Sequence, residues 1–330
     1  MNLPIGKLRG LQQVADDNGF LTICAIDHRG ALKRAMNEKN PNAVTYQDMV
    51  DFKLDLCRAV APFVSAVLLD PVYGAAQAIA AGILPGHIGL LVSLEKTGYS
   101  GEETARITEL LPDWSIEKVK RMGASAVKLL VYFRPDLKEI ASRQMDLVAS
   151  VADQCIKEDI PLLVEPVSYP VEEVGMSSLK FAKMKPELVI ETARQITTLP
   201  IDVLKAEFPA EMEFEQDEKR LLQLCQELDQ ASRLPWVLLS AGADFKTFRK
   251  QVEIACKAGA SGFLAGRALW QEGIQIRSRE ERMNFFKDTA ASRVKELAEI
   301  VNKYGRPWHK KMGSETGEFK TVSENWYQQY

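Results

Sequence analysis

The chain has 330 residues, of which 46% are hydrophobic and 26% are charged, and these proportions are typical of a globular protein. Its formal net charge of −3 excludes a broad basic field that would hold nucleic acid or an anionic membrane. The length suits one large α/β domain or two small ones.

The N-terminal segment, M-N-L-P-I-G-K-L-R-G, has no apolar core of signal-peptide length, and no later segment has the length of a membrane span. Five cysteines are scattered along the chain without a C-x-x-C pair: Cys24, Cys57, Cys155, Cys225 and Cys256. We interpret them as reduced thiols and expect a cytoplasmic protein.

The three histidines, His28, His87 and His309, lie far apart and show no spacing typical of metal ligands. We therefore expect no catalytic metal and no cofactor, although carboxylates alone could still hold Mg²⁺.

Helical segments and short apolar runs alternate through the first part of the chain. In chain order we predict a helix over Ile5–Asn18, a strand over Phe20–Arg29, helices over Ala31–Asn37 and Tyr46–Ala61, a strand over Ala66–Asp70, a helix over Tyr73–Ala81, a strand over Gly89–Glu95, a helix over Ser115–Met122 and a strand over Ala126–Phe133. Gly82 and Gly123 are expected to end the helices that precede them.

The same alternation continues to residue 304. We predict a helix over Lys138–Glu158, a strand over Pro161–Val167, a helix over Pro186–Thr197, a strand over Val203–Phe208, a helix over Glu218–Arg233, a strand over Trp236–Gly242, a helix over Phe245–Ala258, a strand over Gly262–Ala268 and a helix over Glu280–Tyr304. Longer loops are expected over Gly98–Asp113 and Ser168–Met184.

Eight continuous apolar runs alternating with helices predict a (β/α)8 TIM barrel as a single domain, because parallel strands covered by helices are apolar on both faces. No G-x-G-x-x-G follows the first strand, which argues against a dinucleotide-binding domain. We expect the barrel and its short N-terminal helix to occupy residues 1–305. The polar tail, 306–330, is either disordered or packed on a partner subunit.

Polar side chains gather near the ends of the predicted strands, where barrels of this kind carry their chemistry. They are Asp27, His28, Arg29, Asp70, Glu95, Lys128, Glu165, Lys205, Glu207, Ser240 and Arg267. Any one of them is explained by a solvated charge or a helix cap. Their convergence from all eight strands on one barrel mouth instead favours a site.

Lys205 lies in an apolar run, two residues before Glu207, so the two side chains are expected on one face. Either that face is half exposed, or Lys205 is a desolvated amine, a nucleophile for carbonyl groups. Lys128 is a second lysine within a strand. Two adjacent ammonium groups would lower one another's pKa, unless one points outward between helices. Glu165 lies between them, and it can transfer protons, pair with a lysine, or do both.

Glycines in S-A-G (240–242) and A-G-R-A (265–268) allow the backbone to approach a ligand closely, and barrels often bind phosphate at their last two strands. Arg267 adds donors suited to phosphate oxygens. The alternative is a pair of tight turns beside an exposed arginine. We favour the phosphate interpretation because the position in the fold agrees with it.

The chain resembles the class I tagatose 1,6-bisphosphate aldolases, a (β/α)8 family whose relatives include the sulfofructose 1-phosphate aldolases. The resemblance is carried by A-I-D-H-R-G-A-L-K (25–33), L-L-D-P-V-Y-G (68–74), L-E-K-T-G-Y (94–99), A-V-K-L-L-V-Y (126–132), E-P-V-S-Y (165–169), D-V-L-K-A-E-F-P (202–209), P-W-V-L-L-S-A-G (235–242) and G-A-S-G-F-L-A-G-R-A-L-W (259–270). These motifs span most of the chain, and together they are specific.

The resemblance implies a role for each matching position. Lys205 matches the Schiff-base lysine and Glu165 the acid/base carboxylate, while Lys128 and Asp27 match polar residues around the imine. The site for the phosphate of the dihydroxyacetone half is matched by Ser240, Gly242, Gly266 and Arg267. Arg29 matches a position near the distal end of the substrate, and His28 departs from the glutamine of the tagatose enzymes.

The activity implied is metal-free cleavage of D-tagatose 1,6-bisphosphate to dihydroxyacetone phosphate and D-glyceraldehyde 3-phosphate. Since barrels of this size are commonly dimers or larger, we expect a homodimer or higher homo-oligomer. One alternative is a sulfofructose 1-phosphate aldolase, which would release sulfolactaldehyde. Another is a barrel that senses a sugar phosphate without turning it over. A metal-dependent aldolase or isomerase is disfavoured by the absence of clustered histidines.

Overall fold

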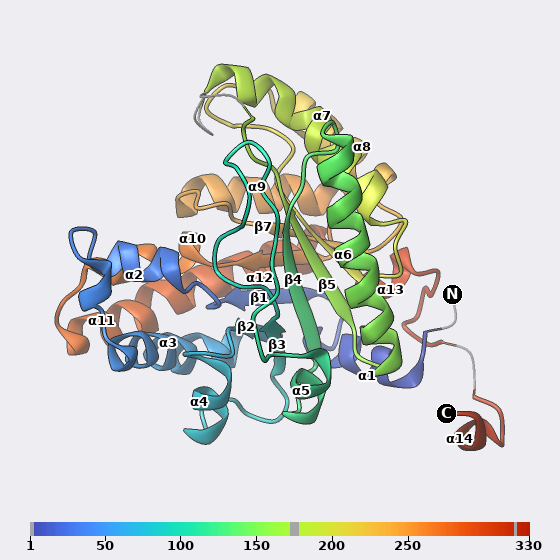
Figure 1. The fold of residues 1–330 in the computed structure, drawn as a ribbon, viewed down its shortest axis with the longest axis horizontal. Coiled ribbons are helices and arrows are strands. Elements are labelled where there is room, and N and C mark those ends of the chain that lie inside the picture. Colours follow the sequence, from blue (N-terminus) through green and yellow to red (C-terminus); the bar gives the residue numbers. More distant parts are fainter. Residues whose placement is uncertain (1–2, 172–177, 320–321) are drawn as a thin grey trace.

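The computed structural model describes residues 3–171, 178–319 and 322–330. Eight parallel strands form a closed barrel in sequence order, and β1 pairs with β8 to complete it (Figure 1). The strands are β1 (Leu21–Ala25), β2 (Ala66–Leu69), β3 (Gly89–Ser93), β4 (Ala126–Tyr132), β5 (Leu162–Val167), β6 (Val203–Ala206), β7 (Trp236–Leu239) and β8 (Gly262–Ala265). The predicted (β/α)8 barrel is confirmed.

The strands are apolar because helices cover them outside and side chains fill the barrel inside. Every strand residue is buried except Leu130 and Tyr132 of β4 and Val167 of β5. These three lie toward the carboxyl ends of neighbouring strands, so solvent reaches the barrel there.

Helices precede, separate and follow the strands along the chain. They are α1 (Ile5–Val14), α2 (Gly30–Met36), α3 (Tyr46–Val60), α4 (Ala75–Ala80), α5 (Ile116–Arg121), α6 (Lys138–Lys157), α7 (Leu179–Ile196), α8 (Glu218–Ala231), α9 (Phe245–Ala258), α10 (Arg267–Trp270), α11 (Arg279–Phe285), α12 (Ala291–Tyr304), α13 (Trp308–Lys311) and α14 (Trp326–Gln329). A π-helical turn, η4 (Phe286–Ala290), joins α11 to α12.

Helix α7 begins at Leu179, earlier than the predicted start at Pro186. The hydroxyl of Ser178 accepts a hydrogen bond from the Phe181 N–H at 3.2 Å and so caps the first turn. The sequence predicts a helix start at Pro186, but the helix continues through this residue. The loop predicted over Ser168–Met184 is therefore too long, and its residues 172–177 lie outside the described residues.

The last two strands end earlier than predicted. After β7 the chain turns, with the Ala243 N–H bonded to the Ser240 carbonyl at 2.8 Å and positive φ at Ala241 and Gly242. After β8, Arg267 begins α10 instead of continuing the strand. The polar groups expected within these strands thus lie just beyond them, where the backbone has left the sheet.

The chain beyond α12 packs back on the barrel. The Trp308 N–H donates to the Gly19 carbonyl at 3.0 Å, and the buried Trp308 ring stacks on Phe319 with 5.6 Å between centroids. Met312 is also buried against the core. Gly19 precedes β1, so this packing closes the amino-terminal end of the barrel. Helix α14 lies at the edge of the molecule (Figure 1).

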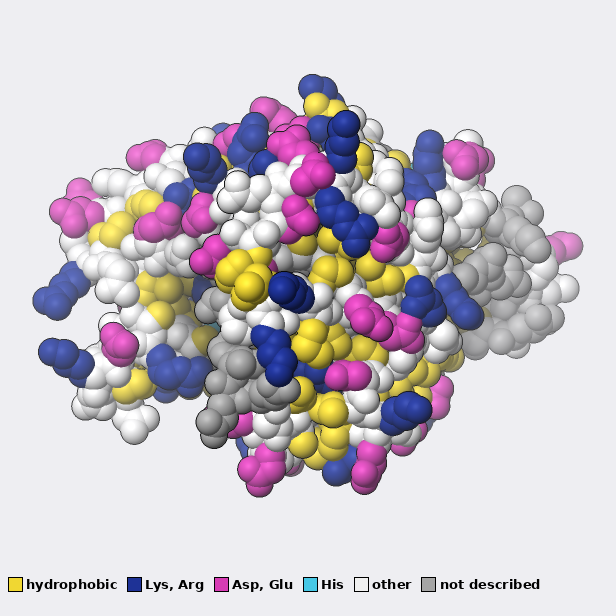
Figure 2. Space-filling model, turned by 90° about the horizontal axis from the view of Figure 1, so that it is seen from above, with side chains coloured by type: hydrophobic (Ala, Val, Ile, Leu, Met, Phe, Trp, Pro, Cys, Tyr) yellow, Lys and Arg dark blue, Asp and Glu magenta, His cyan; other side chains and the backbone are white. Residues whose placement is uncertain are grey.

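On the face shown in Figure 2, basic and acidic side chains are interspersed over the surface. No helix in the described part of the chain is long and apolar enough to cross a membrane. All five cysteines are buried free thiols.

Candidate active site

Lys128 of β4 stands inside the barrel at the centre of three carboxylates. Its side chain is nearly fully buried, and the residue is 1% exposed. Its Nζ lies 2.9 Å from Asp27 Oδ2, 2.7 Å from Glu95 Oε1 and 2.8 Å from Glu165 Oε2. Asp27 and Glu95 follow β1 and β3, while Glu165 belongs to β5. These strands are parallel, so their carboxyl ends bring the three acids to one mouth.

Lys205 of β6 is 4% exposed and points into the same interior. Its Nζ lies 2.7 Å from Glu165 Oε1, so the Glu165 carboxylate bridges the ammonium groups of Lys205 and Lys128. The interpretation of this strand as half exposed is therefore wrong. Neither lysine points outward between helices.

The charges around Glu165 control its protonation. Burial raises the pKa of Glu165, but the ammonium groups of Lys128 and Lys205 lower it by more. The pKa of Glu165 is therefore below its ordinary value. Burial also opposes ionisation of Asp27, yet Lys128 holds the pKa of Asp27 far below its usual range. Both carboxylates are therefore anionic at neutral pH.

The sequence predicted that the two lysines lower one another's pKa, and this prediction is wrong for Lys128. Burial lowers the pKa of Lys128, but Asp27, Glu165 and Glu95 together raise it well above its ordinary value. The three anions outweigh one neighbouring cation because all of them touch the ammonium. Among the described residues, no group of three or more His, Cys, Asp or Glu side chains is arranged to hold a metal ion.

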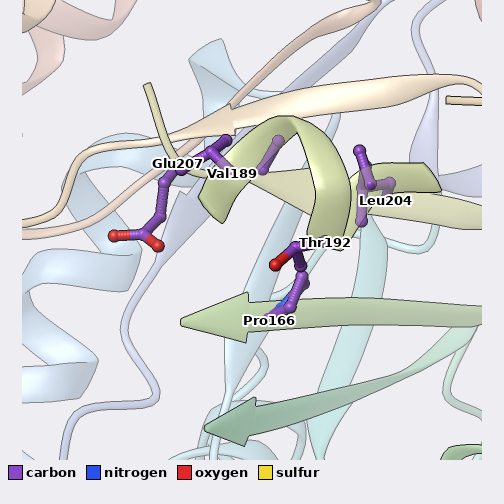
Figure 3. A pocket seen from close by; sticks show the side chains of 7 residues that line it. Pro166, Val189, Thr192, Leu204 and Glu207 are labelled. Carbon is purple, nitrogen blue, oxygen red and sulfur yellow. The ribbon is translucent and has the colours of Figure 1, made fainter. Parts of the chain in front are cut away.

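Glu207 does not share the face of Lys205 as expected. Strand β6 ends at Ala206, and the alternation of side chains ends with it. The Glu207 carboxylate accepts a hydrogen bond from the Ser168 N–H at 2.7 Å, and burial raises its pKa. Figure 3 shows Glu207 in a small pocket with Val189 and Thr192 of α7. Glu207 thus supports the outside of the barrel.

The four residues predicted to hold phosphate come together beyond β7 and β8. Ser240 Oγ accepts a hydrogen bond from the Gly266 N–H at 3.4 Å. Gly242 has a φ of +81°, and a methyl group there would lie 3.0 Å from the guanidinium carbon of Arg267. Glycine therefore allows both the turn and the close approach of Arg267.

His28 lies between Asp27 and the predicted phosphate-binding turn, which consists of residues 240–242 with Gly266 and Arg267. Its Nδ1 is 3.7 Å from Asp27 Oδ1, and its ring meets Trp270 edge-on with 5.2 Å between centroids. A methyl group on Gly266 would come within 2.6 Å of its Cε1. Burial lowers the pKa of His28 to about 4, so its ring is neutral at physiological pH. Arg29 donates from its guanidinium to the Glu95 carbonyl at 2.5 Å.

The sequence did not single out Glu95 or Lys53 for the site. Glu95 was one of many strand-end charges, and only its contact with Lys128 distinguishes it. Lys53 is fully buried on α3, with its Nζ 2.6 Å from Asp70 Oδ2. In the sequence, the indication that Lys53 is buried is its position in the apolar stripe of α3, one turn from Met49 and Leu56.

Curated relatives match nearly the whole chain. Tagatose 1,6-diphosphate aldolase 1 of Enterococcus faecalis is 35% identical over 313 residues, covering 89% of this chain and 94% of that protein. Tagatose 1,6-diphosphate aldolase of Lactococcus lactis is 31% identical over 323 residues, covering 93% and 98%.

Solved structures of aldolases share the fold. A Schiff-base-forming fructose-1,6-bisphosphate aldolase superposes with a TM-score of 0.58 at 21% identity, over 89% of this chain and 99% of that chain. The fructose-bisphosphate aldolase of Plasmodium falciparum gives a TM-score of 0.69 at 14% identity, over 93% and 98%. At these identities the likeness concerns the barrel alone.

The sequence profile described as DeoC/LacD family aldolase matches residues 21–272, from the start of β1 to just beyond α10. That range contains the lysines, the carboxylates and the predicted phosphate-binding turn described above. The match covers most of the chain and agrees with the aldolase names of the relatives. The chain therefore belongs to the DeoC/LacD family of aldolases and is a lyase, as the motifs predicted.

Proposed function

We propose that this aldolase works through a Schiff base on Lys205 and reversibly cleaves D-tagatose 1,6-bisphosphate to dihydroxyacetone phosphate and D-glyceraldehyde 3-phosphate. The observation that carries the proposal is the buried Lys205 amine, 2.7 Å from the Glu165 carboxylate. A desolvated amine beside a proton acceptor is suited to attack a carbonyl group.

The first step is attack of Lys205 on the C2 carbonyl of the ketose. The amine must lose a proton before it attacks, and Glu165 Oε1 is within hydrogen-bonding distance to accept it. Protonated Glu165 then returns the proton to the carbinolamine hydroxyl, which leaves as water, and an iminium ion forms beside the Glu165 anion. That cation withdraws electrons from C3, as a metal Lewis acid would withdraw them through the carbonyl oxygen.

The second step breaks the C3–C4 bond. Glu165, directly or through a water molecule, removes the proton of the C4 hydroxyl, and the bonding pair moves into the iminium to form an enamine. Glyceraldehyde 3-phosphate leaves, C3 is protonated, and hydrolysis releases dihydroxyacetone phosphate and free Lys205. The raised pKa of Lys128 keeps that residue cationic, so it stabilises the Glu165 anion.

The phosphate-binding turn orients the ketose. Strand β6, which carries Lys205, neighbours β7, which leads into Ser240 and Gly242. A phosphate on C1 held by that turn and Arg267 would place C2 next to the amine. Positioning of this kind contributes several kcal/mol to catalysis.

The choice of sugar is supported by the relatives, whose names specify tagatose 1,6-diphosphate. The alternative of a sulfofructose 1-phosphate aldolase finds no support in those relatives, and we do not propose it. A barrel that only senses sugar phosphates does not account for the Lys205–Glu165 pair.

Borohydride reduction tests the proposal. Enzyme incubated with tagatose 1,6-bisphosphate or fructose 1,6-bisphosphate is reduced, digested and mapped by mass spectrometry. We expect a stable adduct on Lys205, turnover of the tagatose sugar, and loss of kcat by about 10⁴-fold or more in Lys205→Met. Treatment with EDTA is expected to leave the activity unchanged, because the iminium supplies the electron sink.

Lys185→Met is the matched control, because Lys185 is a buried lysine that pairs with Glu211 outside the barrel. That variant should still form the Lys205 adduct. An adduct on Lys128, or none on any lysine, would contradict the proposed mechanism, and loss of activity in EDTA would contradict its independence of metal.

A further inference from the structure

The ammonium of Lys53 lies beneath the segment that joins β1 to α2. The residue is 0% exposed, although α3 is an outer helix. Its Nζ donates to the Ile26 carbonyl at 2.5 Å and to the His28 carbonyl at 2.8 Å, and it pairs with Asp70 Oδ2 at 2.6 Å. Two backbone carbonyls thus accept hydrogen bonds from the ammonium, and the Asp70 carboxylate balances its charge.

Asp70 is itself held in place. Its Oδ1 accepts hydrogen bonds from the Val72 N–H at 2.9 Å and the Tyr73 N–H at 2.8 Å, just after β2. The residue is fully buried. The ion pair is therefore anchored at both ends, by α3 on one side and by the loop after β2 on the other.

The two carbonyl groups that Lys53 binds belong to the residues on either side of Asp27. The Asp27 carboxylate contacts Lys128 at 2.9 Å, and the His28 ring packs beside Gly266 of the phosphate-binding turn. Lys53 thus holds the backbone at the point where it presents Asp27 and His28 to the barrel interior.

We propose that Lys53 is a positioning residue, which acts through Asp27 and His28 to align the reaction centre. A buried ion pair is often no more stabilising than well-packed apolar side chains of the same volume. Stability alone therefore does not account for a lysine at this place. The proposal rests on the proposed function, since aldol cleavage is the activity measured.

A second buried pair provides a matched control. Lys7 is 3% exposed, and its Nζ lies 2.8 Å from Asp202 Oδ2. Asp202 also accepts from the Leu162 N–H at 2.8 Å, at the first residue of β5. The pair resembles Lys53–Asp70 in chemistry and burial but lies at the amino-terminal end of the barrel, away from the reaction centre.

Lys53→Met and Lys7→Met are compared for thermal stability, kcat and KM. We expect kcat to fall by about 30-fold in Lys53→Met with KM changed less than about threefold, because small misplacements of reacting groups lower kcat strongly. Lys7→Met should lose a similar amount of stability while kcat at 25 °C changes less than about twofold. Equal kcat in the two variants would overturn the proposal.

If Lys53→Met does not fold, Asp70→Asn tests the same ion pair, because asparagine keeps the shape of aspartate and one carbonyl acceptor. We expect kcat to fall by about tenfold in Asp70→Asn and to stay within about twofold in Asp202→Asn. A wild-type level of kcat in Asp70→Asn would contradict the positioning role. Failure of the wild-type enzyme to form the Lys205 adduct contradicts the proposed function instead, so the two failures are distinguishable.

Discussion

At the scale of single residues, Glu165 connects the two lysines. One oxygen contacts Lys205 and the other contacts Lys128, so the proton transfers proposed for Glu165 would take place beside a fixed positive charge. A carboxylate in an apolar barrel would otherwise take up a proton. The cations keep it ionised and ready to act as a base, which a carboxyl group with a raised pKa would not be at neutral pH.

His28 provides a pH-dependent prediction. Its pKa falls from 6.5 to about 4 in the folded protein, chiefly because of burial. Between those values the unfolded chain binds a proton that the folded protein does not, so stability should fall as the pH drops through this window. Because the ring is 22% exposed, solvent weakens the effect of the pKa shift. We therefore expect His28 to account for a loss of about 2 kcal/mol in the free energy of unfolding between about pH 7 and about pH 4.5.

Urea unfolding of the wild type and His28→Asn at both pH values measures this contribution. The variant should lose about 2 kcal/mol less stability on acidification than the wild type. His87→Asn, at an exposed histidine, should behave as the wild type does. If His28→Asn and the wild type show the same pH dependence, the ring is not held neutral in the folded protein.

At the scale of elements, seven strands supply or lead directly into the residues of the site, and β2 leads into Asp70. Helix α3 sends Lys53 inward to the segment after β1. Its amino terminus carries a capping box, in which Thr45 Oγ1 accepts from the Asp48 N–H at 3.1 Å and the Asp48 carboxylate accepts from the Thr45 N–H at 2.9 Å. The sequence thus specifies where this helix begins.

Thr45→Ala should lower the free energy of unfolding by about 1 kcal/mol, because it leaves a helix N–H without its cap. We expect kcat to stay within about twofold of the wild type, since the far part of α3 holds Lys53 through its own contacts. Thr104→Ala, at an exposed loop threonine, is the control for urea denaturation. An unchanged urea midpoint in Thr45→Ala would show that the cap does not stabilise the helix.

At the scale of the whole molecule, the barrel has two different ends. The carboxyl end carries the ion-pair network and the proposed phosphate-binding turn. The amino-terminal end is covered by α1 and α13, through Lys7 and Trp308. Stability and activity should therefore separate along the barrel axis, as in other barrels of this class.

Trp308→Ala tests this separation. Removing a large buried side chain leaves a cavity, so the free energy of unfolding should fall by about 3 kcal/mol while kcat at 25 °C stays within about twofold. Trp326→Ala, in the exposed helix α14, should change stability by less than about 0.5 kcal/mol. Chemical denaturation and a coupled assay for dihydroxyacetone phosphate measure both quantities. A large loss of kcat in folded Trp308→Ala would contradict the separation.

The sequence by itself determined the barrel and much of the site. Eight apolar runs between helices are a local pattern, and a closed parallel barrel necessarily brings their carboxyl ends together. Lys128, Glu165 and Lys205 could therefore be predicted to meet, because each lies within such a run. The turn after β7 and the glycine after β8 were also evident, since glycine reports a local backbone requirement.

The tertiary structure alone decided which groups touch. Whether the pKa of Lys128 rises or falls depends on carboxylates from β1, β3 and β5, and no spacing along the chain encodes those distances. Glu207 lies on the outside of the barrel because β6 ends at Ala206, two residues earlier than predicted. The role proposed for Lys53 arises from the packing of α3 beneath the segment after β1, because helix periodicity shows only that a face is buried and not what it meets there.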